Sequence, residues 1–118
     1  MKNNYYLIKK KQTVSNFINF FEDDIRLRNI EIAVDLNTDK TLKGIISLGD
    51  LRRLVKKKID YNLQISNFLN KNPITIKESD LNNNLYSKIY NLKKNKNLKI
   101  SEAIVLDDKK KFKFILNF

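Results

Sequence analysis

Apolar residues recur along this 118-residue chain at two spacings, and each spacing predicts an element. From residue 14 to 28 they return every three or four positions, which is the pattern of an amphipathic helix. Thr13 is suited to cap this helix, whose apolar stripe is Val14, Ile18, Phe21 and Ile25. Runs rich in Ile, Val and Leu at 5–10, 30–34 and 42–47 predict strands, the last two forming a hairpin. Helical spacing returns after Asp50 and ends in the lysines at 56–58.

The second half of the chain repeats this order. A short helical turn after residue 65 is stopped at Pro73 and followed by a strand at 74–76. Ser79 or Asp80 can cap a helix with the stripe Leu81, Leu85, Ile89 and Leu92. Two further strands, 101–108 and 112–118, flank a lysine-rich turn and predict another hairpin. The order β-α-β-β therefore occurs twice.

Aligning the two copies relates their apolar skeletons. It places Leu7 on Ile74, Val14 on Leu81, 32–35 on 104–107, Gly44 on Phe114 and Ser47 on Asn117. Because each copy is too small to bury its own apolar face, the copies must pack on each other. We predict an α+β fold of two β-α-β-β units, 1–60 and 61–118, with pseudo-twofold symmetry, the sheets face to face and the helices outside.

The segment "GIISLGD", residues 44–50, carries the chain's most specific polar pattern. Ser47 with an acid three residues later, at Asp50, fits a capping box, in which each side chain satisfies a backbone N–H at the helix start. The same groups suit a ribose and a phosphate, since a carboxylate accepts from two hydroxyls and a helix start attracts anions. The two interpretations are compatible, and both stay open at this point.

Composition narrows the range of functions. The chain has no cysteine or histidine, which excludes disulfides, thiolate metal sites and the commonest general base. No segment resembles a signal peptide or a membrane span, so a cytoplasmic location is expected. The net charge of +11 would suit nucleic acid, but it comes from lysines scattered among many Asn and Ile, so we expect no nucleic-acid partner.

With its repeat and its "GIISLGD" motif, the sequence resembles a tandem CBS-domain pair, or Bateman module, over nearly its whole length. "ISNFLNKNPITI" resembles the segment before the second copy's first strand. The resemblance implies a regulatory module without catalysis that binds AMP, ADP, ATP or a related adenosyl ligand and needs no metal. Ser47 and Asp50 would hold phosphate and ribose, and Arg53 could contact phosphate. The base pocket would consist of Ile45, Tyr6 and Ile8.

The second copy departs from the family pattern. Phe114 replaces the glycine that would let a ligand approach, Asn117 replaces Ser or Thr, and the sequence stops before an Asp or a last helix. We therefore expect a truncated second copy and a single nucleotide site, in the first copy.

The phrase "GDLRR", residues 49–53, is similar to CBS pairs attached to sugar-phosphate nucleotidyltransferases and to arabinose 5-phosphate isomerases. Since the first strand begins almost at Met1, an N-terminal module of a nucleotidyltransferase is the expectation, with that catalytic domain as its partner. Two alternatives remain. The aromatic residues of helix 14–28 suggest a homodimer, so the chain could be a ligand-free dimerisation module. Less favoured is a small basic RNA-binding domain.

Overall fold

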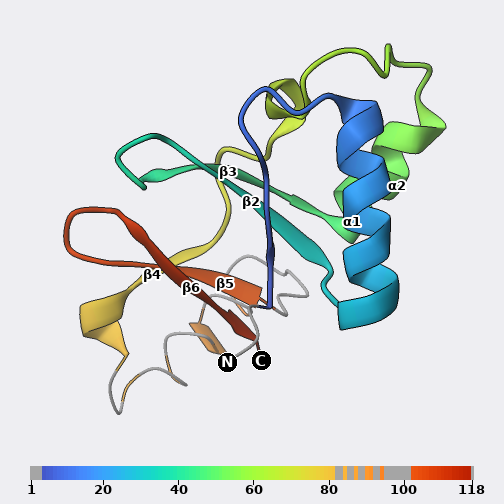
Figure 1. Cartoon of the computed structure of the whole chain (residues 1–118). Coiled ribbons are helices and arrows are strands. Elements are labelled where there is room, and N and C mark those ends of the chain that lie inside the picture. Colours follow the sequence, from blue (N-terminus) through green and yellow to red (C-terminus); the bar gives the residue numbers. More distant parts are fainter. Residues whose placement is uncertain are drawn as a thin grey trace.

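The computed structural model describes residues 4–81, 84, 87, 90, 91, 94 and 102–117. The elements are β1 (Tyr6–Leu7), α1 (Val14–Arg28), β2 (Ile32–Leu36), β3 (Leu42–Ser47), α2 (Leu48–Lys56), the 3₁₀ helix η1 (Ile65–Phe68), β4 (Thr75–Lys77), the 3₁₀ helix η2 (Glu78–Asp80), β5 (Glu102–Leu106) and β6 (Phe112–Asn117). They form two three-stranded sheets, β1-β2-β3 and β4-β5-β6 (Figure 1). In both sheets the first strand is parallel to the middle one and the third is antiparallel to it.

Helix α1 begins where the sequence predicts. The Thr13 hydroxyl accepts a hydrogen bond from the Asn16 N–H at 3.1 Å, which satisfies one of the free donors of the first turn. The helix ends at Asn29, whose left-handed backbone (φ 55°) suits a short polar side chain. Its inner face buries Val14, Phe17 and Phe21 completely, whereas Ile18 and Ile25 are only partly buried. The buried stripe is therefore rotated towards Phe17 relative to the one predicted.

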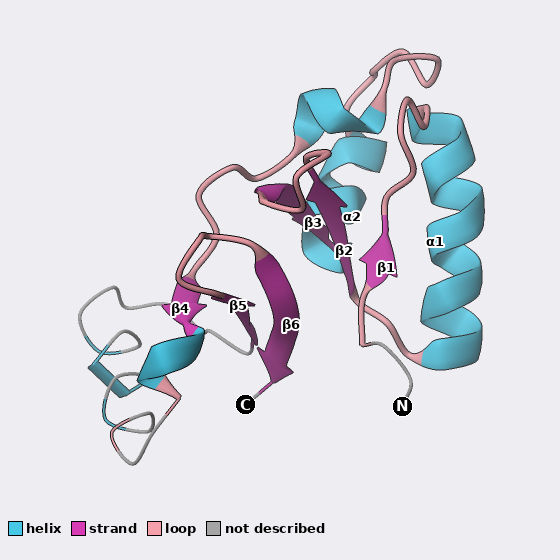
Figure 2. Cartoon of the chain, turned by 60° about the vertical axis from the view of Figure 1, so that its left-hand side comes forward, coloured by secondary structure: helices cyan, strands magenta, loops and turns pink. Residues whose placement is uncertain are grey.

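A first core lies between the helices and one face of the first sheet. Both helices contribute to it, and α2 does so through Leu51 and Leu54. The sheet contributes Tyr6, Ile8, Ala33 and Ile46. Figure 2 shows α1 and α2 on the side of this sheet that faces away from the second sheet. The predicted outer position of the first copy's helices is confirmed.

A second core joins the two sheets face to face. Its buried residues come from both halves of the chain: Ile32, Val34 and Ile45 from the first sheet, and Ile104 and Ile115 from the second. The edge of this layer is closed by Tyr5, whose ring meets Phe112 edge to face at 4.8 Å between centroids. Because the residues of β2 and β3 alternate between the two cores, both faces of the first sheet are covered.

The two hairpins share small irregularities, which shows that they are copies of one unit. Each has a register shift at the same point, between Asp35 and Leu36 and between Val105 and Leu106. Each turn contains a lysine with positive φ, Lys40 at 70° and Lys110 at 64°. The hairpin tips also contact each other, since the Phe112 N–H donates to the Lys40 carbonyl at 3.0 Å.

The register of the strands confirms part of the internal alignment and corrects the rest. Gly44 pairs with Asp35 and Phe114 with Val105, so Gly44 matches Phe114 as predicted, and Ser47 likewise matches Asn117. The same pairs put Asp35 on Val105, so the predicted match of 32–35 to 104–107 is wrong by two residues. The predicted match of Leu7 to Ile74 is wrong by one residue. Val34 and Ile104 occupy equivalent hairpin positions, and the strand partner of Val34 is Leu7, whereas that of Ile104 is Thr75.

The segment from residue 61 to 70 packs on the first unit. The N–H groups of Val14 and Ser15 donate to the carbonyls of Leu63 and Tyr61, and Ile65 is buried in the first core. At the end of the segment, Asn70 forms an antiparallel bridge with Ile45 of β3. As a packing unit, the first half of the fold therefore reaches Asn70, whereas the division at 60 and 61 remains a prediction from the sequence.

Part of the predicted second helix lies outside the described residues, including Leu85, Ile89 and Leu92. Ser87, Tyr90, Asn91 and Lys94, which are described, have helical conformation. Across the described parts of the chain, no helix combines the length and the apolar character that crossing a membrane would require.

Candidate ligand site at the start of helix α2

Ser47 and Asp50 lock the junction between β3 and α2. The Ser47 hydroxyl accepts from the Asp50 N–H at 3.1 Å, and Asp50 Oδ2 accepts from the Ser47 N–H at 3.0 Å. This reciprocal pair is the capping box that the sequence predicts. Ser47 has extended backbone geometry and still pairs with Ile32 across the hairpin. The motif therefore has a structural role whether or not a ligand binds.

The Asp50 carboxylate is also held by Arg53, which donates to its Oδ1 atom from one helical turn later. Burial, the largest single influence on this group, would raise its pKa. The hydrogen bonds from the Ser47 N–H, the Arg53 guanidinium and the Ser47 side chain outweigh burial, so that the pKa of Asp50 is lowered. At neutral pH Asp50 is an ionised acceptor, with its side chain 30% exposed against 69% for Arg53.

The first turn of α2 offers fewer free donors than a bare helix start. The Leu48 N–H donates to the Glu31 carbonyl at 2.8 Å, and the Asp50 N–H is taken by Ser47. Between them, the Gly49 N–H is the remaining donor of this turn. An anion at this position would meet that N–H, the Ser47 hydroxyl and the helix dipole.

The structure brings four of the six predicted site residues to one region and places the other two elsewhere. Ser47, Asp50 and Arg53 lie together, and Ile45 points to the same side of β3 as Ser47, towards the second sheet. Tyr6 and Ile8 point to the opposite face, into the core beneath α1. The Tyr6 hydroxyl accepts there from Gln12 at 2.9 Å, and burial raises the pKa of Tyr6.

Two residues that lie near this region were not predicted from the sequence. Tyr5, rather than Tyr6, faces the second sheet at the start of β1. Asn70 lies against Ile45, with which it exchanges two backbone hydrogen bonds of 3.0 and 2.8 Å. The position of Tyr5 could have been predicted, because neighbouring strand residues face opposite sides of a sheet and Tyr5 therefore faces away from Tyr6. No local signal marked Asn70, which arrives from the connecting segment.

Gly44 is needed for the connecting segment. A Cβ atom at Gly44 would lie 2.7 Å from Leu69 Cβ and 3.0 Å from the Asn70 carbonyl oxygen. Leu69 and Asn70 therefore occupy the space that the family resemblance reserved for a ligand approaching the backbone. At the matching register of the second hairpin stands Phe114, which is 38% exposed.

The described residues contain no group of three or more His, Cys, Asp or Glu side chains placed to hold a metal ion. The region around Ser47 thus offers hydroxyl, carboxylate, guanidinium and backbone N–H groups. These are groups that recognise a sugar hydroxyl or a phosphate.

Neither a protein-family model nor a curated protein matches the sequence. Solved structures, in contrast, resemble the whole fold. A CBS-domain protein from Pyrobaculum aerophilum complexed with AMP has a TM-score of 0.71 at 16% identity, over 99% of this chain and 82% of that one. A CBS-domain pair complexed with 5′-methylthioadenosine and S-adenosylmethionine also has a TM-score of 0.71 at 16% identity, over 98% of this chain and 87% of that one.

A third similar structure is the cytosolic domain of the Mg²⁺ channel MgtE in complex with ATP. It has a TM-score of 0.71 at 17% identity, over 99% of this chain, which spans 43% of that chain. At these identities the likeness establishes the fold. The chain has the α+β fold of a CBS-domain pair, as its sequence predicts.

Proposed function

We propose that this chain is a cytoplasmic regulatory module that senses an adenosyl ligand through Ser47 and Asp50 and has no catalysis of its own. The observation that carries the proposal is the position of this pair. Both residues sit where β3 meets α2, and Ser47 lies on the same face of β3 as Ile45, which packs against the second sheet. Similar structures of this fold hold AMP, ATP or S-adenosylmethionine, which supports an adenosyl ligand here as well.

The bonding capacity of the pair is compatible with both roles. Each carboxylate oxygen of Asp50 can accept two hydrogen bonds, and each receives one inside the protein. One acceptor position per oxygen is left for the two ribose hydroxyls. The Ser47 oxygen accepts from the Asp50 N–H, and its O–H, which acts on the Asp50 carboxylate, can turn to donate to a phosphate. Arg53, largely exposed, can turn from Asp50 towards that phosphate.

Regulation would follow from the connecting segment. The ligand region adjoins the bridge between Ile45 and Asn70, and Asn70 leads directly into the second unit. A ligand held by Ser47 and Asp50 would favour one arrangement of the two units over another. The resemblance of "GDLRR" supports a sugar-phosphate nucleotidyltransferase as the catalytic domain whose activity this shift would bias. A coupling of about 1–3 kcal/mol would give a useful response.

A homodimer is a second proposal, now resting on a different feature from the one expected. Phe17 and Phe21 are buried in the chain's own core, so only Phe20, 45% exposed, is left from the aromatic cluster. A groove of about 630 Å³ instead runs between α1 and α2. Its apolar lining is Ile18, Ile25, Leu48, Leu51 and Val55. If no ligand binds at Ser47, pairing through this groove would be the module's remaining function.

Binding of adenosyl ligands tests the main proposal. We expect AMP, ATP or S-adenosylmethionine to give heat in calorimetry. Asp50→Ala should weaken binding roughly 10- to 150-fold, the value of one or more hydrogen bonds to a charged group. Thr13→Ala is the matched control. It removes the cap of α1, which should lower the free energy of unfolding by about 1 kcal/mol, as the loss of the α2 cap does, but it does not touch the site.

Asn117→Ala, at the register of Ser47 in the second unit, should also leave the affinity unchanged. No heat with any of the three ligands, or an equal loss in Thr13→Ala and Asp50→Ala, would reduce Ser47 and Asp50 to a helix cap.

A further inference from the structure

A second cavity of about 480 Å³ lies away from Ser47 and Asp50, where β1 and β2 end. The loop after β1 forms one wall, the start of the β2–β3 turn forms another, and η1 closes the third side. The polar and charged residues of its lining include Lys10, Lys11, Lys43, Asp35, Gln64 and Ser66. The volume is within the range of small-ligand pockets. Apolar residues line part of it, and the remainder is polar or basic.

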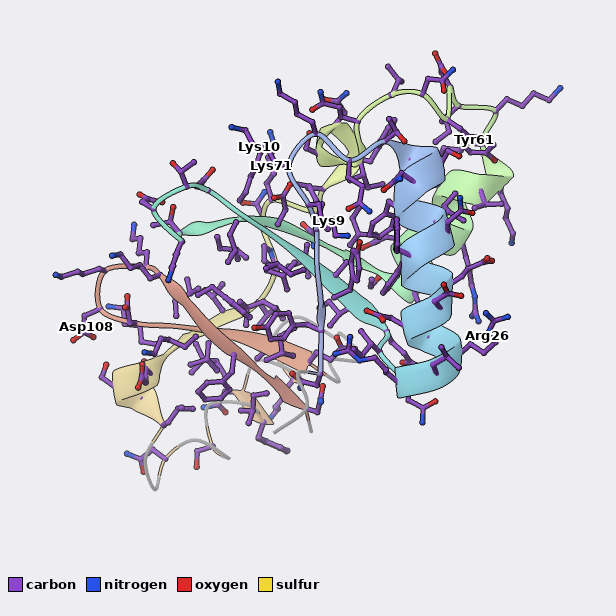
Figure 3. All side chains as sticks on the ribbon, in the orientation of Figure 1. Lys9, Lys10, Arg26, Tyr61, Lys71 and Asp108 are labelled. Carbon is purple, nitrogen blue, oxygen red and sulfur yellow. The ribbon has the colours of Figure 1, made fainter. Side chains whose placement is uncertain are left out.

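Positive charge dominates this cavity. Four lysines line it against a single carboxylate, that of Asp35. Figure 3 shows Lys9 and Lys10 on the loop that follows β1. The Lys9 ammonium lies over the ring of Phe20, 4.5 Å from its centre, so it is already partly engaged. The side chains of Lys10, Lys11 and Lys43 are exposed to an incoming anion, and Lys43 also interacts with the Asp35 carboxylate.

The lysine loop is held in place by a buried glutamine. Gln12 is 5% exposed, and its side chain accepts from the Lys9 N–H and donates to the Tyr6 hydroxyl and to Asn16. Its backbone accepts from the Ile65 N–H and donates to the Lys9 carbonyl. Both ends of the four-residue turn from Lys9 are therefore anchored to the core. A loop ordered before binding loses less entropy when a ligand arrives.

The turn itself is built from an unusual residue. Lys11 has a left-handed backbone with φ of 59°, at a turn position where glycine or asparagine is favoured. Lys40 and Lys110 adopt the same left-handed backbone in the two hairpin turns, so this conformation is not peculiar to Lys11. The choice of lysine brings a third consecutive positive charge to the mouth of the cavity.

The second unit provides an internal comparison. By the strand registers, its matching cavity lies at the ends of β4 and β5, and it carries three aspartates, Asp80, Asp107 and Asp108, beside Lys77 and Lys110. The same fold in the same lysine-rich chain thus gives a lining of mixed charge in one unit and a basic lining in the other. Neither the fold nor the overall composition accounts for the basic lining.

From this geometry we propose that the cavity binds a polyphosphate group, either as a free polyphosphate or as the phosphate tail of a nucleotide. Lys10, Lys11 and Lys43 would neutralise the phosphate oxygens, and Gln64, Asn37 and Ser66 offer hydrogen-bond donors around them. Asp35, 8% exposed at the cavity wall, opposes an anion. Its burial raises its pKa, which weakens but does not remove that opposition.

Titration of the full chain with inorganic tripolyphosphate at 0.15 M salt, about physiological ionic strength, tests this proposal. Lys10→Gln with Lys11→Gln should weaken binding about tenfold, since two exposed ion pairs are lost. The control, Lys57→Gln with Lys58→Gln after α2, makes the same change in net charge away from the cavity and should cost less than about twofold. Asp35→Asn should tighten binding about threefold, because it removes the opposing carboxylate.

Parallel titrations with ATP and AMP separate the sources of the ligand. Tripolyphosphate binding that depends on Lys10 and Lys11 identifies a site for free polyphosphate. Dependence with ATP but not with tripolyphosphate identifies a nucleotide tail. An equal loss in the two double variants, no binding of either compound, or a lysine-dependent affinity for single-stranded RNA alone would overturn the proposal. ATP is also a proposed ligand of Ser47 and Asp50, so the ATP and AMP titrations are made in the Asp50→Ala background. The dependence on Lys10 and Lys11 then reports on this cavity alone, and the two proposals fail separately.

Discussion

Replacing Gly44 with alanine should destabilise the fold, because the new methyl group has no space. It would lie 2.7 Å from Leu69 Cβ and 3.0 Å from the Asn70 carbonyl oxygen, both closer than side-chain carbons normally approach. Neither neighbour is the free end of a long side chain, so the connecting segment itself would have to move. That movement would strain the two hydrogen bonds between Ile45 and Asn70.

The cost follows from two contributions. Overpacking at a filled site costs about 1–3 kcal/mol. Weakening the Ile45–Asn70 bridge adds up to about 1 kcal/mol for each hydrogen bond that is lost. We expect the free energy of unfolding to fall by about 2 kcal/mol, which corresponds to roughly 8 °C in Tm for a chain of this size.

Gly49, the chain's other glycine, is a matched control with the opposite expected sign. A Cβ atom there would lie 3.6 Å from an Arg53 guanidinium nitrogen and 3.7 Å from the Ser47 hydroxyl, which are ordinary contacts. Because Gly49 lies inside α2, Gly49→Ala should stabilise the protein by about 0.5–1 kcal/mol through better helix propensity.

Thermal and urea unfolding of the wild type and the two variants would measure both effects. If Gly44→Ala unfolds with the wild-type midpoint, the packing of Leu69 and Asn70 against Gly44 does not explain the glycine. A variant of unchanged stability that loses only its adenosyl ligand would instead show that the glycine serves ligand approach, as the family resemblance implies.

Two further outcomes can be checked directly. The lowered pKa of Asp50 means that its ionised form stabilises the fold above the ordinary value of 3.8, so Asp50→Asn should lose the full stability near pH 7, and this loss should disappear as the pH falls below about 4. The raised pKa of Asp35 predicts the opposite sign: Asp35→Asn should gain stability at pH 7 and gain none at pH 3. Urea unfolding across this pH range measures both effects. If the groove between α1 and α2 joins two copies, the wild type should sediment as a dimer of about twice the 14.0 kDa chain, and Val55→Glu should convert it into monomer. Leu63→Glu, at an exposed position outside the groove, should leave the dimer intact. A monomeric wild type at high concentration would rule out the dimer.

Elements that depend on neighbouring residues could be predicted from the sequence. Thr13 begins α1, and Ser47 with Asp50 caps α2, because each cap involves groups three residues apart. Runs rich in Ile, Val and Leu located both hairpins, since a short continuous apolar run indicates a strand that is covered on both faces. The repeat of these elements was sufficient to predict two units with their sheets packed together.

Features that depend on contacts between distant segments needed the tertiary structure. Alternation leaves register undetermined by steps of two, which is why 32–35 was matched to 104–107 although Asp35 aligns with Val105. A spacing of three or four also allows neighbouring stripes on α1, and packing against Tyr6 selected Phe17 and Phe21 for burial. The contact of Leu69 and Asn70 with Gly44, and the cavity that gathers Lys10, Lys11 and Lys43, join segments far apart in the chain. Such contacts exist only once the chain has closed on itself, so no local pattern encodes them.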